Sequence, residues 1–267
     1  MFSRKCSTIG MLHLRPLPGA AGFDGNVETI MDIALREAVL YKDAGFDSLL
    51  LENMHDVPFL KGRVEPETSA AMAVISAAVK KETGLPVGIQ ILAAANIEAL
   101  GVAVAASLDY IRVEAFVFAH VADEGYIEAS APELIRRRWN LKSEHIQIFA
   151  DIKKKHSAHA ITGDISLADT AKAAEFFKAD GVIVTGMHTG DAPDSVELQA
   201  VRKSVGCRVL AGSGVSAENV QQYLPNCDGL IVGSSLKKDG KWDNELDKDR
   251  VKRFIEACRK AEAQFLV

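Results

Sequence analysis

The sequence predicts an α/β protein, a single (β/α)8 (TIM) barrel domain that spans residues 1–267. Short apolar runs typical of buried strands alternate with longer segments whose apolar residues recur at helical spacing. Counted in order, eight strand–helix units fill about 250 residues, the usual size of such a barrel. The competing architecture is an open doubly wound sheet, which gives no reason for the eighth unit to repeat the seventh so closely.

The first half of the chain contains four of these units. Strands are expected at 8–14, 48–51, 87–92 and 110–115, and helices at 27–44, 67–81 and 97–106, with a fourth helix starting near Pro132. The first helix is indicated by Ile30, Ala34, Ala38 and Tyr41 at helical spacing, and Gly45 is expected to end it. The segment 116–130 is expected to be irregular, and to serve as a lid or as an oligomer contact.

The second half repeats the pattern. Strands are expected at 147–152 and 181–185 and within 208–216 and 229–236, and helices at 167–179, from about Asp194, and from Asp247 to about Gln264. Asp164 or Ser166 is the expected cap of the helix at 167–179.

Composition narrows the classes of function. The net charge of −5 argues against a nucleic-acid-binding surface. The four cysteines (Cys6, Cys207, Cys227 and Cys258) form no CxxC pair, which favours a reduced compartment. No apolar run reaches the roughly 18 residues of a membrane span. Only about seven residues precede the first strand, which leaves little room for a transit peptide. We therefore expect a cytoplasmic protein, and its small-residue-rich helices favour a homo-oligomer.

Glycine and serine follow both of the last two strands, as Gly212-Ser213-Gly214 and as Gly233-Ser234-Ser235. Such residues let a ligand approach backbone N–H groups closely, and one such strand end alone is weak evidence because glycine also serves simple turns. Two of them after strands seven and eight of a barrel coincide with the usual phosphate position. A short helix over Ser234–Lys237 would add its N-terminus. The sequence therefore predicts a phosphate site here.

Charged residues at the other strand ends are the candidate catalytic groups: Glu52, Arg112, Glu114, Asp151 and Lys153. Arg112 and Glu114, like Asp151 and Lys153, are two residues apart, so each pair is expected on one strand face, pointing into the barrel. Lys153 could act as a general acid, an electrophile or a Schiff-base amine. The alternative interpretation is an ion-pair network that fills the barrel centre.

Further ligand-binding candidates lie at the same end of the predicted barrel: His13, Gln90, Asn96, Thr185, Gly186 and His188. A divalent metal could be held by Glu52, Glu114 and Asp151, but no HExxH-like or paired-histidine spacing supports it. No metal and no cofactor is therefore predicted.

An ordered set of motifs resembles the BtpA family over nearly the whole chain. The matching stretches are 12–19 (LHLRPLPG), Glu52-Asn53, 112–114 (RVE), 150–156 (ADIKKKH), 184–186 (VTG) and 212–215 (GSGV). The resemblance implies a barrel of the ribulose-phosphate-binding type. The family takes its name from a cyanobacterial protein needed for photosystem I accumulation, and it also includes members assigned to sugar metabolism.

Two functions remain open at this point. The first is an enzyme of lyase, isomerase or nucleosidase type that acts on a small phosphorylated metabolite, either a sugar phosphate or nucleotide-like. The second is a non-catalytic factor for the assembly or stability of other proteins, which would leave the charges at the barrel mouth paired among themselves.

Overall fold

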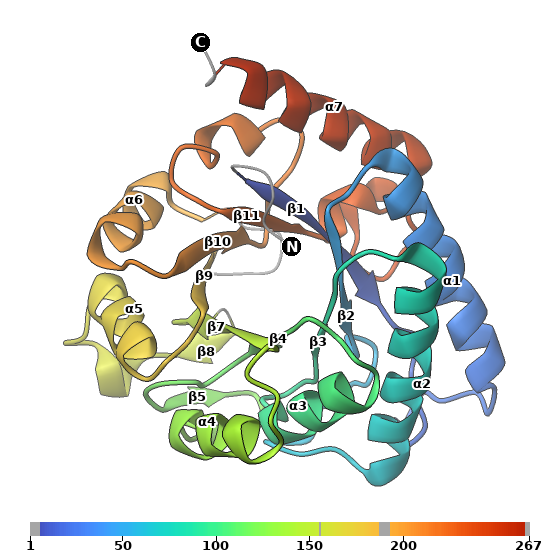
Figure 1. Cartoon of the computed structure of the whole chain (residues 1–267), viewed down its shortest axis with the longest axis horizontal. Helices are drawn as coiled ribbons and strands as arrows, with labels where there is room; N and C mark the ends of the chain where they lie inside the picture. Colours follow the sequence, from blue (N-terminus) through green and yellow to red (C-terminus); the bar gives the residue numbers. More distant parts are fainter. Residues whose placement is uncertain (1–5, 155, 187–192, 265–267) are drawn as a thin grey trace.

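Eight parallel strands close into a barrel in the computed structural model, which describes residues 6–154, 156–186 and 193–264 (Figure 1). Their order around the barrel is β1-β11-β10-β9-β7-β4-β3-β2. The strands are β1 (Ser7–His13), β2 (Ser48–Glu52), β3 (Val87–Gln90), β4 (Tyr110–Val113), β7 (Gln147–Ile152), β9 (Gly181–Thr185), β10 (Arg208–Gly212) and β11 (Gly229–Val232). The predicted (β/α)8 barrel is confirmed.

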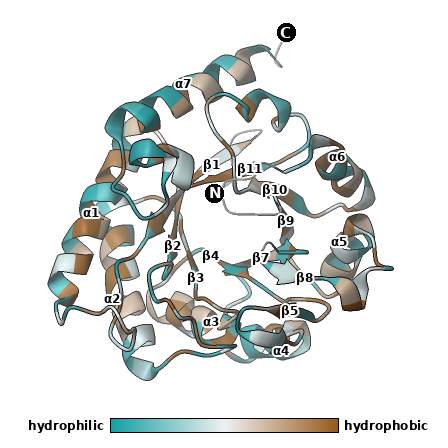
Figure 2. Cartoon of the chain, turned by 180° about the vertical axis from the view of Figure 1, so that it is seen from behind, coloured by the Kyte–Doolittle hydropathy of each residue, from teal (hydrophilic) through white to brown (hydrophobic). Residues whose placement is uncertain are grey.

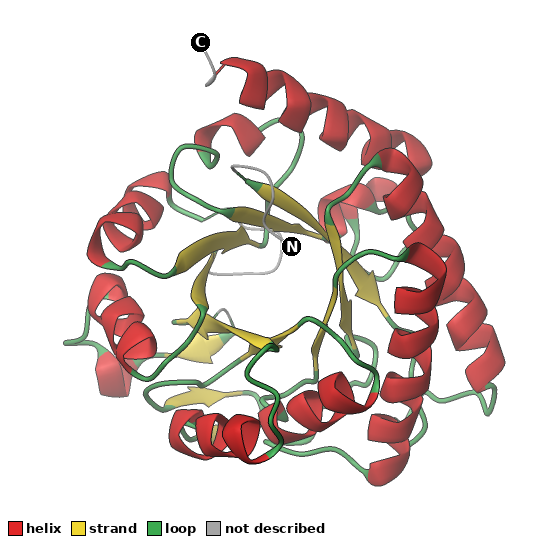
Figure 3. Cartoon of the chain, viewed as in Figure 1, coloured by secondary structure: helices red, strands yellow, loops and turns green. Residues whose placement is uncertain are grey.

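Helices form a ring outside the strands (Figure 3). They are α1 (Val27–Ala44), α2 (Pro66–Thr83), α3 (Asn96–Ala105), α4 (Ala131–Asn140), α5 (Leu167–Phe176), α6 (Ser195–Ser204) and α7 (Lys248–Gln264). Each carries both hydrophobic and hydrophilic residues, as helices do when one face covers a sheet (Figure 2). In α1, for example, Ile30, Ala34, Ala38 and Tyr41 are buried, and Gly45 ends the helix with φ 92°.

The seventh unit departs from the prediction because no α-helix follows β10. The chain between β10 and β11 instead contains a single 3-10 turn, η2 (Val220–Gln222). Pro225 follows this turn closely, and a proline can neither donate a helical hydrogen bond nor leave the preceding residue free to stay helical. The unit therefore keeps its strand and its crossover but not its helix.

The segment expected to be irregular contains a β-hairpin. β5 (His120–Ala122) and β6 (Gly125–Ile127) pair antiparallel, and β5 also pairs with β8 (Ser157–Ala158), the three forming a small second sheet. Asp123 and Glu124 make the two-residue connection of this hairpin. The small sheet joins the chain beyond β4 to the chain beyond β7, at the carboxyl ends of two neighbouring barrel strands.

Apolar side chains fill the lower part of the barrel interior: Ile9, Met11, Leu50, Tyr110, Phe149, Ile183, Leu210 and Ile231. The Tyr110 ring fits because Gly88 has no side chain; a Cβ there would lie 2.1 Å from the ring. Two residues further along several of these strands the same interior face becomes polar, as in Leu50 to Glu52 and Phe149 to Asp151, whereas Leu210 and Ile231 lead to glycines. The apolar layers therefore form the floor on which a polar site is built.

Aspartates stand at the opposite end of the barrel, directly before four of the strands: Asp47, Asp109, Asp180 and Asp228. Each accepts a hydrogen bond from the backbone N–H of a residue in the adjacent strand, Thr8, Val87, Ile148 and Val209 respectively. Three of them also pair with a basic helix residue, Lys80, Arg138 or Arg202. We call these four residues the lower aspartates; they tie adjacent strands and helices together.

Candidate functional site

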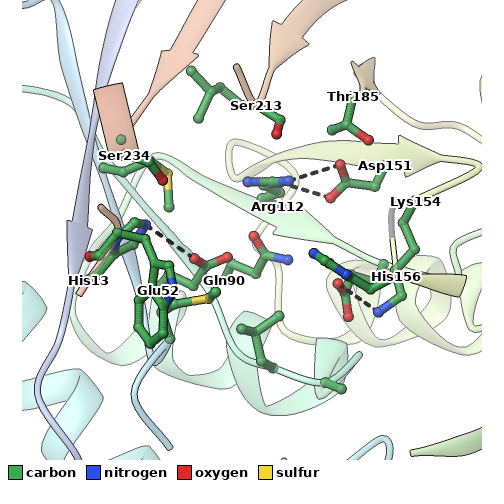
Figure 4. Close-up of a pocket in the computed structure, with 18 of the residues that line it drawn as sticks. His13, Glu52, Gln90, Arg112, Asp151, Lys154, His156, Thr185, Ser213 and Ser234 are labelled. Carbon is green, nitrogen blue, oxygen red and sulfur yellow. Dashed lines mark hydrogen bonds and ion pairs between the residues drawn. The ribbon is translucent and has the colours of Figure 1, made fainter. Parts of the chain in front are cut away.

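A cavity of about 490 Å³ opens at the carboxyl ends of the barrel strands. Twelve of the predicted site residues line it: His13, Glu52, Gln90, Arg112, Glu114, Asp151, Thr185, Ser213, Gly214, Gly233, Ser234 and Ser235. Figure 4 shows many of them converging on the cavity from different strands. The structure thus brings these residues together, and the catalytic or binding role assigned to each stays a prediction.

Arg112 and Asp151 form a two-pronged ion pair across β4 and β7. Arg112 donates from Nε to Asp151 Oδ2 at 2.8 Å and from Nη2 to Oδ1 at 3.0 Å, with the Asp151 side chain only 1% exposed (Figure 4). Burial alone would lower the pKa of Arg112, but the charge of Asp151 outweighs it, and the pKa is raised above its ordinary value. The guanidinium therefore stays charged, as a fixed positive group at the cavity centre.

Glu114 lies beside this pair, and burial is the largest influence on its pKa. One of its carboxylate oxygens accepts from Lys154 Nζ at 3.2 Å, and the other accepts from the Ala94 N–H at 3.1 Å. Burial raises the pKa of Glu114, and the charge of Asp151 raises it further, although Lys154 opposes both. A carboxyl group with a raised pKa in a cavity is suited to carrying a proton to or from a ligand.

The expectation that Lys153 faces the cavity beside Asp151 is wrong. β7 ends at Ile152, and Lys153 takes a left-handed backbone with φ 46°, which breaks the alternation of strand faces. Its Nζ lies 3.4 Å from the Thr162 carbonyl, and the residue lines a small neighbouring cavity of about 20 Å³, which Asp151 and Lys154 also line. Lys154 lines the main cavity instead. Consecutive lysines gave no sequence signal for choosing between them.

Other predicted residues lie behind the cavity wall. Asn96 donates to the Glu114 carbonyl at 2.7 Å and to Ser130 Oγ at 2.8 Å, so it positions the loop after β4. Gly186 and Gly212 are buried and do not line the cavity. His188 falls outside the described residues.

The ends of β10 and β11 present backbone rather than charged side chains. Ser213 and Gly214 have left-handed φ values of 65° and 58°. The 3-10 turn η3 (Ser234–Leu236) begins immediately after β11, and among the described residues the N–H groups of Ser234 and Ser235 have no acceptor. A Cβ at Gly233 would lie 3.1 Å from Met11 Cβ, so a larger residue would have to displace its neighbours by a few tenths of an ångström. We call residues 213–214 and 233–235 the glycine-serine rim.

Three buried polar atoms on the cavity wall find no partner within the described part of the chain. They are Gln90 Oε1, Glu124 Oε2 and Thr185 Oγ1. A buried polar group left unpaired costs about 1–3 kcal/mol, so such groups are typical of sites where a ligand completes the hydrogen bonding.

Sequence reasoning missed an apolar side of the same cavity. Met54, Val57, Pro58, Phe59, Leu92 and Trp242 line it; we call this set the apolar wall. Trp242 lies 4.8 Å from His55 between ring centroids, and its carbonyl is 3.3 Å from His13 Nδ1. Burial, with the nearby charges of Arg15 and Lys237, lowers the pKa of His55 to about 4, so this ring is neutral near pH 7. A tryptophan in a polar loop after the last strand was the available signal.

Over residues 6–154, 156–186 and 193–264, no group of three His, Cys, Asp or Glu side chains is arranged to hold a metal ion. Within the same described residues, no helix combines the length and the apolar character that crossing a membrane requires.

The family model that describes the BtpA family matches residues 4–260. The chain belongs to the BtpA family. An uncharacterized protein of Caenorhabditis elegans, named as mitochondrial, is 45% identical over 92% of this chain and 90% of its own length. The photosystem I biogenesis protein BtpA of Synechocystis is 36% identical over 93% of this chain and 86% of its own. The expected cytoplasmic location stays a prediction, since the nematode relative is named mitochondrial.

Solved structures share the fold at low sequence identity. A thiamine phosphate pyrophosphorylase from Pyrococcus furiosus superimposes with a TM-score of 0.58 at 13% identity, covering 96% of this chain and 97% of that one. An orotidine 5′-phosphate decarboxylase from Pyrococcus horikoshii gives 0.57 at 15% identity, covering 94% and 99%. At this level of identity the likeness establishes the barrel fold, not a shared reaction.

Proposed function

We propose that this BtpA-family barrel is an enzyme that binds a small phosphorylated metabolite by its phosphate at the glycine-serine rim. The observation that carries the proposal is the pair of open N–H groups at Ser234 and Ser235, beside Gly214, at the end of the barrel where such enzymes hold phosphate. The two neighbouring folds named above are enzymes whose names include a phosphate compound.

The chemistry would occur across the cavity from the rim. A phosphate fixed at the rim holds the rest of the ligand in one place, which raises the effective concentration of reacting groups. Glu114, with its raised pKa, is placed to act as general acid or base, and Arg112 stabilises negative charge that develops on the ligand. Lys154 pairs with Glu114 and takes the role first predicted for Lys153. Lyase, isomerase and nucleosidase reactions all use such groups.

A charge placed at the rim tests the binding half of the proposal. Ser234→Asp puts a carboxylate where the phosphate would lie, and Ser107→Asp adds the same charge at an exposed, left-handed position after α3. We expect inorganic phosphate, ribose 5-phosphate or a nucleoside 5′-monophosphate to raise the melting temperature of the wild type and of Ser107→Asp. At 100 times Kd a ligand adds about 2.7 kcal/mol of stability. Failure of every phosphate compound to stabilise the wild type would contradict the proposal.

A second candidate is an assembly or stability factor for other proteins, favoured by the printed name of the Synechocystis relative. Turnover separates the two. Phosphorus NMR of phosphorylated metabolites incubated with the wild type and with Glu114→Gln should show conversion by the wild type alone. A ligand that binds but is converted by neither protein would favour the non-catalytic candidate.

A further inference from the structure

The two sides of the cavity differ in the chemistry that they offer a ligand. The glycine-serine rim and the Arg112–Asp151 pair are polar, whereas the apolar wall combines aliphatic, thioether and aromatic groups. The wall comes from the loops after β2 and β3 and from Trp242, and the rim comes from the loops after β10 and β11. Because β1 lies between β11 and β2 in the barrel, the wall and the rim flank one strand.

Hydrogen bonds hold the wall in place. Asn53 donates to Asp56 at 3.0 Å and accepts from the Leu92 N–H at 2.7 Å, which ties the loop after β2 to the loop after β3. Asp56 also accepts from the Leu17 N–H at 2.8 Å. Trp242 is fixed through its carbonyl at His13 and packs against the neutral ring of His55. Because the apolar wall is already held in place, ligand binding does not include the entropy cost of ordering it.

A sugar phosphate alone would not use this wall. Its sugar carries hydroxyl groups, which favour hydrogen-bonding partners over methyl, thioether and indole surfaces. The cavity volume of about 490 Å³ also lies in the range of sites for larger organic ligands. A planar ring would bury apolar area against Met54, Phe59 and Trp242, and its polar edge could pair with the orphan Gln90 Oε1.

From this arrangement we infer that the ligand is a phosphate ester that also carries an aromatic ring, of the nucleoside 5′-monophosphate class. Its ring lies on the apolar wall against Trp242 while its phosphate lies at the glycine-serine rim. This inference rests on the proposed function, since it takes the phosphate site as given, and it narrows the ligand from any phosphorylated metabolite to one class.

Trp242 can itself report on the ligand. The chain has two tryptophans, and Trp139 is 70% exposed on α4, so Trp139→Phe leaves Trp242 as the one indole fluorophore. In this background we expect nucleoside 5′-monophosphates to change the emission and to bind at least about tenfold more tightly than ribose 5-phosphate, because a stacked base contributes to affinity. An unphosphorylated nucleoside should bind weakly, since it lacks the rim contact.

Calorimetric titration of two further variants separates the wall from the rim. Trp242→Ala keeps the carbonyl that contacts His13, and it should weaken nucleotide binding by between about 5-fold and about 100-fold. Its affinity for ribose 5-phosphate should stay unchanged, and Trp242→Phe should restore most of the nucleotide affinity. Phe59→Ala, on a different loop, should weaken the nucleotide selectively as well, so that the test does not depend on one variant folding.

The outcomes distinguish this inference from the function on which it rests. Equal affinity for nucleotides and ribose 5-phosphate, unchanged in Trp242→Ala and Phe59→Ala, would overturn the aromatic-ring assignment. If Ser234→Asp still abolished that shared binding, the phosphate site would stand. Absence of binding by every phosphate compound would overturn both.

Discussion

The two ends of this barrel use charged side chains in opposite ways. The lower aspartates each accept a backbone N–H from an adjacent strand, and three also pair with a basic helix residue. The mouth also pairs its charges, in Arg112–Asp151 and Glu114–Lys154, but those side chains line a cavity. Beside them Gln90 and Thr185 keep buried polar atoms without partners among the described residues.

The difference separates charges whose bonds all go to the barrel from charges that line the cavity where we propose that a ligand binds. A satisfied carboxylate whose bonds all go to its own strands and helices has no capacity left for anything else. A pair on a cavity wall also stabilises the barrel, but it lies next to unsatisfied polar atoms and to a carboxyl group with a raised pKa, which can still bind a ligand. Breaking one pair at each end therefore measures how much that pair contributes to the stability of the barrel and how much to ligand affinity.

The largest effect is expected from the buried pair at the mouth. Asp151→Ala leaves Arg112 charged and unpaired in the barrel, which should lower the free energy of unfolding by about 3–5 kcal/mol. Urea denaturation measures the loss, and ligand affinity should fall with it. The double variant Arg112→Met/Asp151→Leu should recover most of the stability without recovering the affinity. Recovery of both would show that the pair has no role beyond packing.

At the lower end, removal of an aspartate should cost stability alone. Asp180 accepts from the Ile148 N–H at 2.8 Å and from Arg138 Nη1 at 2.6 Å, so Asp180→Ala should lower the free energy of unfolding by about 2 kcal/mol or more. Glu256→Ala, which removes an exposed i,i+4 pair on α7, is the control and should cost under about 0.5 kcal/mol. A change in ligand affinity of more than twofold in folded Asp180→Ala would contradict the prediction that this aspartate contributes to stability alone.

Removing a hydroxyl that has no hydrogen-bond partner at the mouth should raise the free energy of unfolding instead of lowering it. Thr185→Val replaces an unsatisfied buried Oγ1 by a methyl group, which should raise the free energy of unfolding by up to about 1 kcal/mol. The same substitution should weaken ligand binding. Thr170→Val is the matched control, because its hydroxyl donates to the Ser166 carbonyl at 2.9 Å. The control should lose about 1 kcal/mol. If both variants lost stability equally, Thr185 would not be kept for a ligand.

The barrel and much of its cavity were predictable because strand periodicity is a local property. Alternation along β4 and β7 placed Arg112 and Asp151 on the interior face, and the position of Glu52 at the end of β2 placed it at the mouth. Unit counting placed the glycine-serine rim at the last two strands. The same reasoning failed one residue beyond β7, where the left-handed backbone of Lys153 turns Lys154 toward the cavity. Alternation holds only while the chain stays extended.

Features built by distant contacts were not predictable from local pattern. Trp242 reaches the cavity through contacts with His13 and His55, far away in sequence, and no periodicity encodes them. The missing helix after β10 has a local signal in Pro225, which a count of repeating units does not take into account. The hairpin of β5 and β6 is stabilised partly by pairing with β8, a partner that lies beyond β7.

The smallest expected effect concerns pH and the small sheet beside the mouth. Burial, with the charges of Lys154 and His159, lowers the pKa of His120 from 6.5 to about 4. The unfolded chain therefore binds this proton more readily, and stability should fall as the pH drops from 6.5 toward 4. At pH 6 the loss should stay under about 1 kcal/mol, because only part of the proton uptake by the unfolded chain has occurred at that pH.

His120→Gln removes the titrating ring, so its unfolding free energy, followed by urea denaturation from pH 7 to pH 4, should fall less steeply than that of the wild type. Glu114 titrates in the opposite sense, because its raised pKa makes the folded state bind the proton more tightly. It does so in both proteins, and the difference between the two curves isolates His120. Parallel curves would show that the His120 ring takes up its proton equally well in the folded chain.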